Sequence, residues 1–122
     1  MAPRHLRGSR LLAGVVLGAV LFLGACGQEE APEVPQGAGG TQDAVLVEGR
    51  DLWSSQCARC HGASGGGGSG PKLSDGRANE LYPEVADMEQ VIAEGRNAMP
   101  AFGGSLTPEE IDAVTRYVRE VL

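Results

Sequence analysis

The sequence predicts an all-α fold on three observations. Apolar residues recur every three to four positions in each segment that could contribute to a core, which is the period of an amphipathic helix. Two of these segments begin with a capping-box pattern, in which a capping residue precedes a Glu or Gln by three positions. No stretch alternates apolar and polar residues for long enough to form a β-strand, and no internal repeat is present.

The first 25 residues are interpreted as an export signal that lies outside the fold. Arg4, Arg7 and Arg10 give it a positive start, and Leu11 to Leu23 is an uncharged apolar run of 13 residues. As a helix this run would span only ~20 Å, against ~30 Å of bilayer hydrocarbon. The length therefore favours the apolar region of a signal peptide over a membrane-spanning helix.

The end of the signal resembles the bacterial lipobox. Leu23-Gly24-Ala25-Cys26 places a leucine and two small residues before a cysteine. The resemblance implies cleavage after Ala25 and diacylglyceryl addition to Cys26, so that a lipid would anchor the chain to a membrane. The alternatives are an ordinary signal peptide that ends near a cysteine, or an uncleaved anchor.

Residues 26–44 are predicted to be the lipidated cysteine and a flexible tether. The segment after Cys26 is rich in Pro, Gly, Gln and acidic residues and has few apolar ones, so it cannot bury enough surface to offset its ordering entropy. Some 18 residues would reach ~20–25 Å on average and ~60 Å fully stretched. The folded domain is expected over residues 45–122, which is close to the size at which a single core is marginal.

The first helix of the domain is expected to carry Leu46, Gly49 and Trp53 on one face and to continue into Cys57-Ala58-Arg59-Cys60-His61. Two cysteines two residues apart, followed at once by a histidine, are typical of c-type haem attachment. Each thiol adds to one vinyl group of the haem, and the adjacent imidazole becomes the proximal iron ligand. One covalent haem c would also supply the apolar centre that so small a domain needs.

Two other readings of the motif fit less well. A structural zinc site needs four ligands, and beyond Cys57, Cys60 and His61 the sequence offers only Cys26 and His5, both in the segment assigned to export and anchoring. A thioredoxin-like Cys-x-x-Cys would need a βαβ context, and no strand pattern surrounds this motif.

The second predicted helix of the domain follows a capping-box pattern over Asp87 to Gln90, and Gly95 is a plausible C-cap. Its apolar stripe is Met88, Val91 and Ile92.

Met99 is expected to be the second axial ligand of the iron, in the loop of residues 97–102. A thioether paired with histidine favours reduced iron and raises the potential. Pro100 stiffens the loop, so the sulfur can be held in place. The alternative is that Met99 is an ordinary core residue, but that role fits Met88 better because Met88 lies on a helical stripe.

The last helix has the clearest signals. Thr107 is the expected N-cap, Pro108 occupies the first helical position, and Glu110 completes a capping box. Its expected buried stripe is Ile111, Val114, Val118 and Val121.

Taken together, the domain resembles the small class I cytochromes c, in particular the short bacterial and photosynthetic monohaem type. The resemblance covers about 78 residues and rests on the haem motif with Gly62, on Gly70-Pro71-Lys72-Leu73, on Met99 to Gly104, and on the helix start at Leu106 to Glu110. It implies about three to four helices wrapped around one covalent haem. It also implies haem attachment outside the cytoplasm, so the two motif cysteines form thioethers and not a disulfide.

The resemblance assigns further roles. The carbonyl of Pro71 should accept a hydrogen bond from the imidazole of His61, which fixes the ring and tunes its basicity. The first and last helices should cross at a small residue beside an aromatic one, a role that Gly49 with Trp53 and Val114 with Tyr117 would fill.

Two features near the motif remain open at this point. The glycine run of residues 65–68 is read either as a flexible loop or as a place where the chain passes close to the haem. Lys72, Arg77 and Arg96 could each pair with a haem propionate, and the sequence does not choose among them.

The charge balance excludes a nucleic-acid binder. The full chain has a net charge of −6, and removing the three arginines of the signal leaves 7 basic against 16 acidic residues, a net charge of about −9. An electrostatically steered partner should therefore present a basic face. The alternative is that the acidity only keeps an exported protein soluble.

We expect a one-electron carrier and not an enzyme, because an iron with both axial sites filled has no place for a substrate. The resemblance and the lipobox place it on the extracytoplasmic side of a bacterial membrane, either in a periplasm or on the outer face of the cytoplasmic membrane. Its donor would be a quinol-oxidising complex, and its acceptor an oxidase, a reductase or a photosynthetic reaction centre. The alternatives are a haem subunit permanently docked in a larger oxidoreductase and, from another class, a haem-based sensor or small peroxidase.

Overall fold

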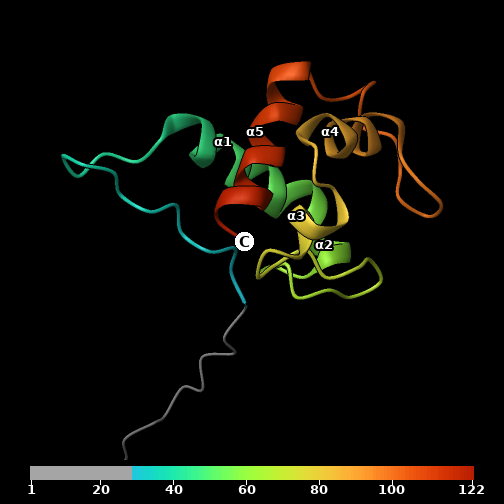
Figure 1. Ribbon diagram of the computed structural model, residues 1–122, viewed down its shortest axis with the longest axis horizontal. Helices are drawn as coiled ribbons and strands as arrows, with labels where there is room; N and C mark the ends of the chain where they lie inside the picture. Colours follow the sequence, from blue (N-terminus) through green and yellow to red (C-terminus); the bar gives the residue numbers. More distant parts are fainter. Residues whose placement is uncertain (1–28) are drawn as a thin grey trace, which may run out of the picture.

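The computed structural model describes residues 29–122, and the regular elements of this part of the chain are five α-helices and one π-helical turn (Figure 1). The predicted signal and Cys26 lie outside these residues. Between residues 29 and 122 there is no named strand, only the isolated bridges Gln36–Gln42 and Arg96–Met99. The all-α prediction is therefore confirmed. The elements are α1 (Ala44–Leu52), the π-helical turn η1 (Trp53–Cys57), α2 (Ala58–His61), α3 (Arg77–Leu81), α4 (Val85–Glu94) and α5 (Pro108–Glu120).

Helix α1, the π-helical turn and α2 form one continuous helical path that ends at His61. Asp43 caps its start by accepting a hydrogen bond of 2.9 Å from the Val45 N–H. The expected face of this path is buried, with Leu46 8% and Trp53 1% exposed. In η1 the Ala58 N–H donates to the Trp53 carbonyl five residues earlier, which is the π-helical pattern.

Helix α4 begins earlier than the sequence predicted. Its N-cap is Glu84, which makes no side-chain cap hydrogen bond, and Asp87 lies in the first turn instead of capping it. A carboxylate there is still favourable, because it faces the positive end of the helix dipole. The helix ends at Gly95 with φ of 75°, as predicted.

Helix α5 begins with the predicted capping box. The Thr107 hydroxyl accepts from the Glu110 N–H at 3.2 Å, and the Thr107 N–H donates to the Glu110 carboxylate at 2.7 Å. Its predicted stripe is buried except for Val121, which is only partly buried at the end of the helix. Tyr117 is fully buried on the same helix.

Helices α1 and α5 cross at Gly49. A methyl group built there would lie 2.1 Å from the Ala113 carbonyl oxygen and 2.8 Å from the Tyr117 Cβ. The prediction of a small residue at the crossing is therefore confirmed, and Tyr117 is its aromatic neighbour. The backbone that Gly49 allows to approach belongs to Ala113 and not to Val114, which lines the cavity described below.

Residues 31–34 pack against the domain, in contrast to the expectation that the whole segment before α1 stays out of the core. Ala31 and Val34 are 6% and 3% exposed and belong to the same apolar cluster as the helices. Two isolated apolar side chains among polar and proline residues carry no helical or strand period, so sequence periodicity missed them.

We expect Gly49→Ala to lower the free energy of unfolding by ~1–3 kcal/mol, because the added methyl group meets the backbone of α5, which no side-chain rotation can relieve. Guanidinium unfolding of the haem-loaded protein measures this. Gly104→Ala is the matched control, since a methyl group there has nothing within 4 Å. Equal unfolding midpoints for the two variants would contradict the crossing described above.

Candidate haem-binding site

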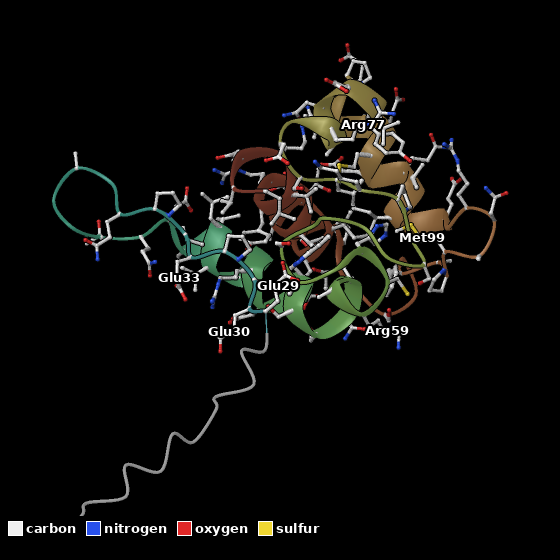
Figure 2. The ribbon with its side chains drawn as sticks, turned by 90° about the horizontal axis from the view of Figure 1, so that it is seen from below. Glu29, Glu30, Glu33, Arg59, Arg77 and Met99 are labelled. Carbon is white, nitrogen blue, oxygen red and sulfur yellow. The ribbon has the colours of Figure 1, made fainter. Side chains whose placement is uncertain are left out.

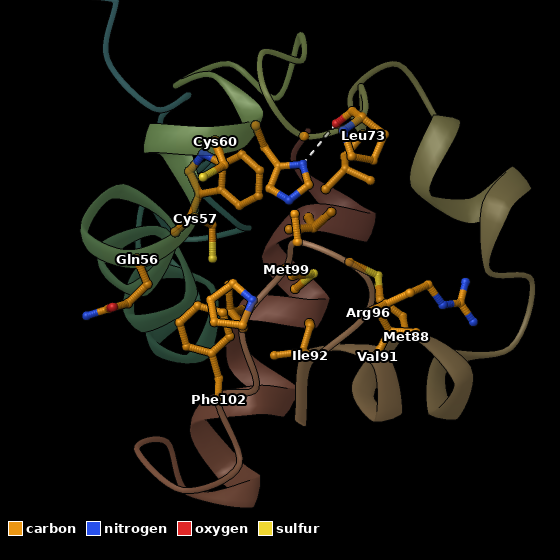
Figure 3. A pocket seen from close by; sticks show the side chains of 18 of the residues that line it. Gln56, Cys57, Cys60, Leu73, Met88, Val91, Ile92, Arg96, Met99 and Phe102 are labelled. Atoms are coloured by element: carbon orange, nitrogen blue, oxygen red, sulfur yellow. Dashed lines mark hydrogen bonds between the residues drawn. The ribbon is translucent and has the colours of Figure 1, made fainter. Parts of the chain in front are cut away.

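The residues that the sequence singled out surround one cavity of about 360 Å³ between α2, α4, α5 and the loop before α5 (Figure 3). Both motif cysteines, His61, Pro71 and Met99 contribute to its wall. Apolar side chains supply most of the remainder, chiefly Trp53, Leu73, Ile92, Phe102, Val114 and Val118. This combination of two thiols, one imidazole and a thioether in an apolar cavity fits a c-type haem.

His61 is oriented by its hydrogen bond to the backbone. Its Nδ1 lies 2.9 Å from the Pro71 carbonyl oxygen, the contact that the resemblance implied. A carbonyl oxygen can only accept, so Nδ1 carries the proton and Nε2 keeps its lone pair for a metal. The ring is 8% exposed, and the Trp53 ring lies beside it at 5.9 Å between centroids. Trp53 is itself fixed by donating to the Ala63 carbonyl at 2.8 Å.

Glycines let the next loop close over the motif. A Cβ at Gly70 would lie 2.7 Å from Cε1 of His61, and a Cβ at Gly68 would lie 2.8 Å from the Cys60 carbonyl oxygen. The Gly70 N–H donates to that same carbonyl at 2.8 Å, and the Gly67 N–H donates to the His61 carbonyl at 2.7 Å. Gly67 and Gly68 of the glycine run thus lie close to the backbone of the haem motif, and Gly70 after the run lies against the His61 ring.

Cys57 and Cys60 are both half-buried in the cavity wall, and no disulfide joins them. Burial raises the pKa of the Cys57 thiol to about 11, and the nearby positive charge of Arg59 offsets only part of this effect. Before haem attachment, Cys57 is therefore a thiol and not a thiolate at neutral pH. Because disulfide exchange proceeds through the thiolate, this environment disfavours oxidation before the sulfur is used in a thioether.

Met99 lies in the loop between α4 and α5, as predicted, and is half-buried in the cavity wall. Two backbone hydrogen bonds with Arg96, of 3.1 and 2.9 Å, close the loop beneath it. Gly95 permits the closure, because a Cβ there would lie 2.6 Å from the Met99 carbonyl oxygen. Met88 also contributes to the wall, from α4 beside Val91, and is 3% exposed (Figure 3). Both thioethers therefore border the cavity.

Of the three basic residues left open above, only Arg96 lines the cavity. Lys72 pairs with Asp75 at 2.7 Å, and Arg77 pairs with Glu80 at 2.8 Å, both on the surface. The guanidinium of Arg96 instead lies 5.9 Å from the centre of the Tyr82 ring, which also borders the cavity. Arg96 is thus the one of the three that borders the cavity in which a haem would lie.

The motif residue Arg59 is exposed and contributes to the wall of the cavity. The structure does not describe Cys26, so the predicted lipidation site lies outside the described residues.

Comparison with known proteins agrees with this chemistry. Residues 44–118 match the family of cytochrome c oxidase, cbb3-type, subunit III. The chain is 31% identical to cytochrome c-551 of Bacillus subtilis over 112 residues, which is 92% of this chain and 94% of that protein. It is 32% identical over 87 residues to FixP, a cbb3-type cytochrome c oxidase subunit of Sinorhizobium medicae. The matched region covers 63% of this chain but only 30% of that protein.

Among solved structures, cytochrome c6C from a Synechococcus species superimposes with a TM-score of 0.51 at 30% identity, covering 60% of this chain and 92% of that one. These similarities agree with the all-α fold around one haem cavity. Among residues 29–122, no helix is both long enough and apolar enough to cross a membrane.

We expect Met99→Ala to open one axial position of the iron and Met88→Ala to leave both filled. The Met99 variant should become partly high-spin when oxidised, lose the sulfur-to-iron charge-transfer band, bind carbon monoxide more readily and show a lower reduction potential. Visible spectra and redox titration measure these changes. The Met88 variant should keep the spectrum and lose ~2–5 kcal/mol of stability through the cavity it leaves. If Met88 and not Met99 controls the spectrum, the ligand assignment is wrong.

Proposed function

The chain belongs to the family of cbb3-type cytochrome c oxidase subunit III, and we propose that it works as a membrane-tethered one-electron carrier outside the cytoplasm. As a small class I c-type cytochrome it carries one covalent haem c and transfers electrons. The observation that most favours a carrier is that an imidazole and a thioether border the same apolar cavity. With both axial positions filled, the iron exchanges electrons and has no place for a substrate.

Each residue of the site has a defined task in this proposal. Cys57 and Cys60 would hold the haem through thioethers, and His61 and Met99 would be its axial ligands. The Pro71 carbonyl keeps His61 in the orientation that would bind the iron. Rigid ligands favour rapid electron exchange, because little has to move between the oxidised and reduced states. The loop closed by the Arg96–Met99 backbone pair and the glycine loop that passes the histidine both serve that rigidity.

The proposed location at a membrane rests on the residues before the haem domain. Residues 1–25 have the pattern of a lipoprotein signal, and Cys26 is the residue that would carry the lipid. A lipid anchor needs no membrane-spanning helix, and it would keep the domain beside membrane complexes on the extracytoplasmic side. The proposed donor is a quinol-oxidising complex, and the proposed acceptor is an oxidase, a reductase or a reaction centre.

A second candidate function is a haem subunit held permanently in an oxidase. The similarity to FixP, of whose length the chain spans 30%, favours it. The similarity to cytochrome c-551 covers 94% of that protein. It favours the independent carrier, because cytochrome c-551 is scarcely longer than the region that it shares with this chain. Purification from membranes in mild detergent distinguishes the two, since a subunit would copurify with its oxidase in fixed stoichiometry.

We expect the purified holoprotein to shuttle electrons between a quinol-oxidising complex and an oxidase in reconstituted vesicles. Turnover should fall as salt rises, because exposed charges are screened beyond ~8–10 Å at ordinary ionic strength and the chain is strongly acidic. Oxygen uptake by the oxidase is the measurement. Peroxide turnover by the chain alone, with a high-spin spectrum, would instead indicate the small peroxidase. A flat dependence on salt would leave the acidity with no role in docking.

We expect Cys26→Ser to release the mature protein from membranes with its visible spectrum unchanged, because the haem ligands all lie within residues 57–99. Fractionation of cells, followed by haem staining of the soluble and membrane fractions, measures this. If the variant still sediments with membranes after its signal is removed, the lipid anchor is disproved.

A further inference from the structure

The described chain begins with a segment that is docked on α1 and α5, here called the N-terminal strap (residues 29–34). In Figure 2 the labelled strap residue Glu33 lies beside α1, well apart from Met99 at the haem cavity. The strap inserts Ala31 and Val34 into the apolar cluster of the domain. The carbonyl of Val34 also accepts a 2.6 Å hydrogen bond from the side chain of Gln42.

Arg50 on α1 forms hydrogen bonds with the backbone of the strap. Its guanidinium donates to the Ala31 carbonyl at 2.9 Å, to the Pro32 carbonyl at 3.1 Å and to the Glu33 carboxylate at 2.6 Å. The Arg50 side chain is only 23% exposed. Bonds from a charged donor are stronger than neutral ones, and a half-buried guanidinium without its acceptors would be costly. The strap therefore completes the surroundings of Arg50.

Tyr117 on α5 forms a hydrogen bond with the same part of the strap. Its hydroxyl donates to the Pro32 carbonyl at 2.7 Å, although 85 residues separate the two in sequence. The residue is 0% exposed, and burial raises the pKa of its hydroxyl to about 12, so it remains a donor at any physiological pH. One carbonyl is thus held by two donors from the two helices that cross at Gly49.

The length of chain between the anchor and this docking point is short. Four residues separate Cys26 from Ala31, whereas the segment up to the start of α1 at Ala44 is much longer. A chain spans at most ~3.6 Å per residue, so Ala31 can lie no more than about 18 Å from Cys26, whereas Ala44 could lie ~60 Å away if the strap were free.

We propose that docking of the strap on Arg50 and Tyr117 fixes the haem domain close to its membrane anchor, in place of a domain that swings on the full length of the segment. The proposal rests on the proposed function, because it takes Cys26 as the anchored residue. Pro32 and Pro35 support it, since a proline restricts the unbound chain and so lowers the entropy that docking costs. The α1–α5 surface is thus a binding site whose occupant is the chain's own extended segment.

A protease test measures the docking directly. The Glu-specific protease cleaves after Glu33 only where the surrounding backbone can leave the domain. In the holoprotein beginning at Cys26, we expect the combined Arg50→Gln and Tyr117→Phe variant to be cleaved about tenfold faster than the native chain, because several hydrogen bonds that hold the strap are lost. Arg77→Gln is the matched control, since it removes a surface ion pair away from the strap.

A distance test measures the reach. Once the thioethers occupy Cys57 and Cys60, Cys26 is the one thiol left in the chain, so it can be coupled to a maleimide lipid in vesicles that carry a headgroup fluorophore. This coupling does not depend on lipidation in the cell, so its outcome is separate from that of the Cys26→Ser experiment. The haem quenches the fluorophore more strongly the closer the domain lies.

We expect strong quenching by the native chain and by Arg77→Gln, and clearly weaker quenching by the double variant. Tyr117→Phe alone, which removes only a hydroxyl, should give an intermediate value while the haem spectrum stays unchanged. Equal cleavage rates would show that the strap is not held by these residues. Equal quenching despite faster cleavage would show that docking does not set the distance from the anchor. Either result overturns the proposal.

Discussion

The close crossing of α1 and α5 is the contact on which the rest of the molecule depends. Gly49 has no side chain, so the backbone of α1 can approach the Ala113 carbonyl on α5. One consequence lies on the cavity side, where the crossing brings the helical path that carries the cysteines and His61 opposite Val114 and Val118. Another lies on the outer side, where the same crossing brings Arg50 of α1 and Tyr117 of α5 close enough together to bind the strap. A single steric constraint thus positions both the cofactor site and the strap.

Backbone groups of the site constrain the orientation of His61. The carbonyl of Pro71 selects the tautomer of His61, and the loop that delivers this carbonyl is held by hydrogen bonds to the carbonyls of Cys60 and His61. Because backbone bonds of this kind do not depend on long flexible side chains, they hold the metal-binding nitrogen in one direction. The apolar wall around it then limits water, which favours an electron carrier over a site for substrate.

Much of this could be predicted from sequence because the signals were local. The haem motif has a fixed spacing, the last helix has a complete capping box, and Gly95 ends α4 as predicted. The start of α4 was misplaced because Asp87 suits a first turn as well as a cap, and the choice depends on the chain path before it. Arg96 could be selected only by seeing that Lys72 and Arg77 already pair with neighbouring carboxylates.

The strap escaped prediction for a different reason. Its composition is that of a linker, and composition reports only the average tendency of a segment to fold. What holds it is a pair of donors, Arg50 and Tyr117, that lie far along the chain and meet only after α1 and α5 have packed. Long-range pairing of this sort leaves no period in the sequence, so it becomes visible only in three dimensions.

The π-helical turn at Trp53–Cys57 sets the direction in which the haem motif leaves α1. A π turn contains about one residue more than an α turn, so the residues after it point about a quarter of a turn away from where an uninterrupted α-helix of the same residues would place them. Loss of one residue between Leu52 and Cys57 could be absorbed by an ordinary α-helix with no broken hydrogen bond. Both sulfurs and the imidazole would then keep their direction toward the cavity, because one residue fewer in an α turn covers the same rotation as the π turn. An α-helix that kept every residue would instead turn the haem motif away from the cavity by about a quarter of a turn.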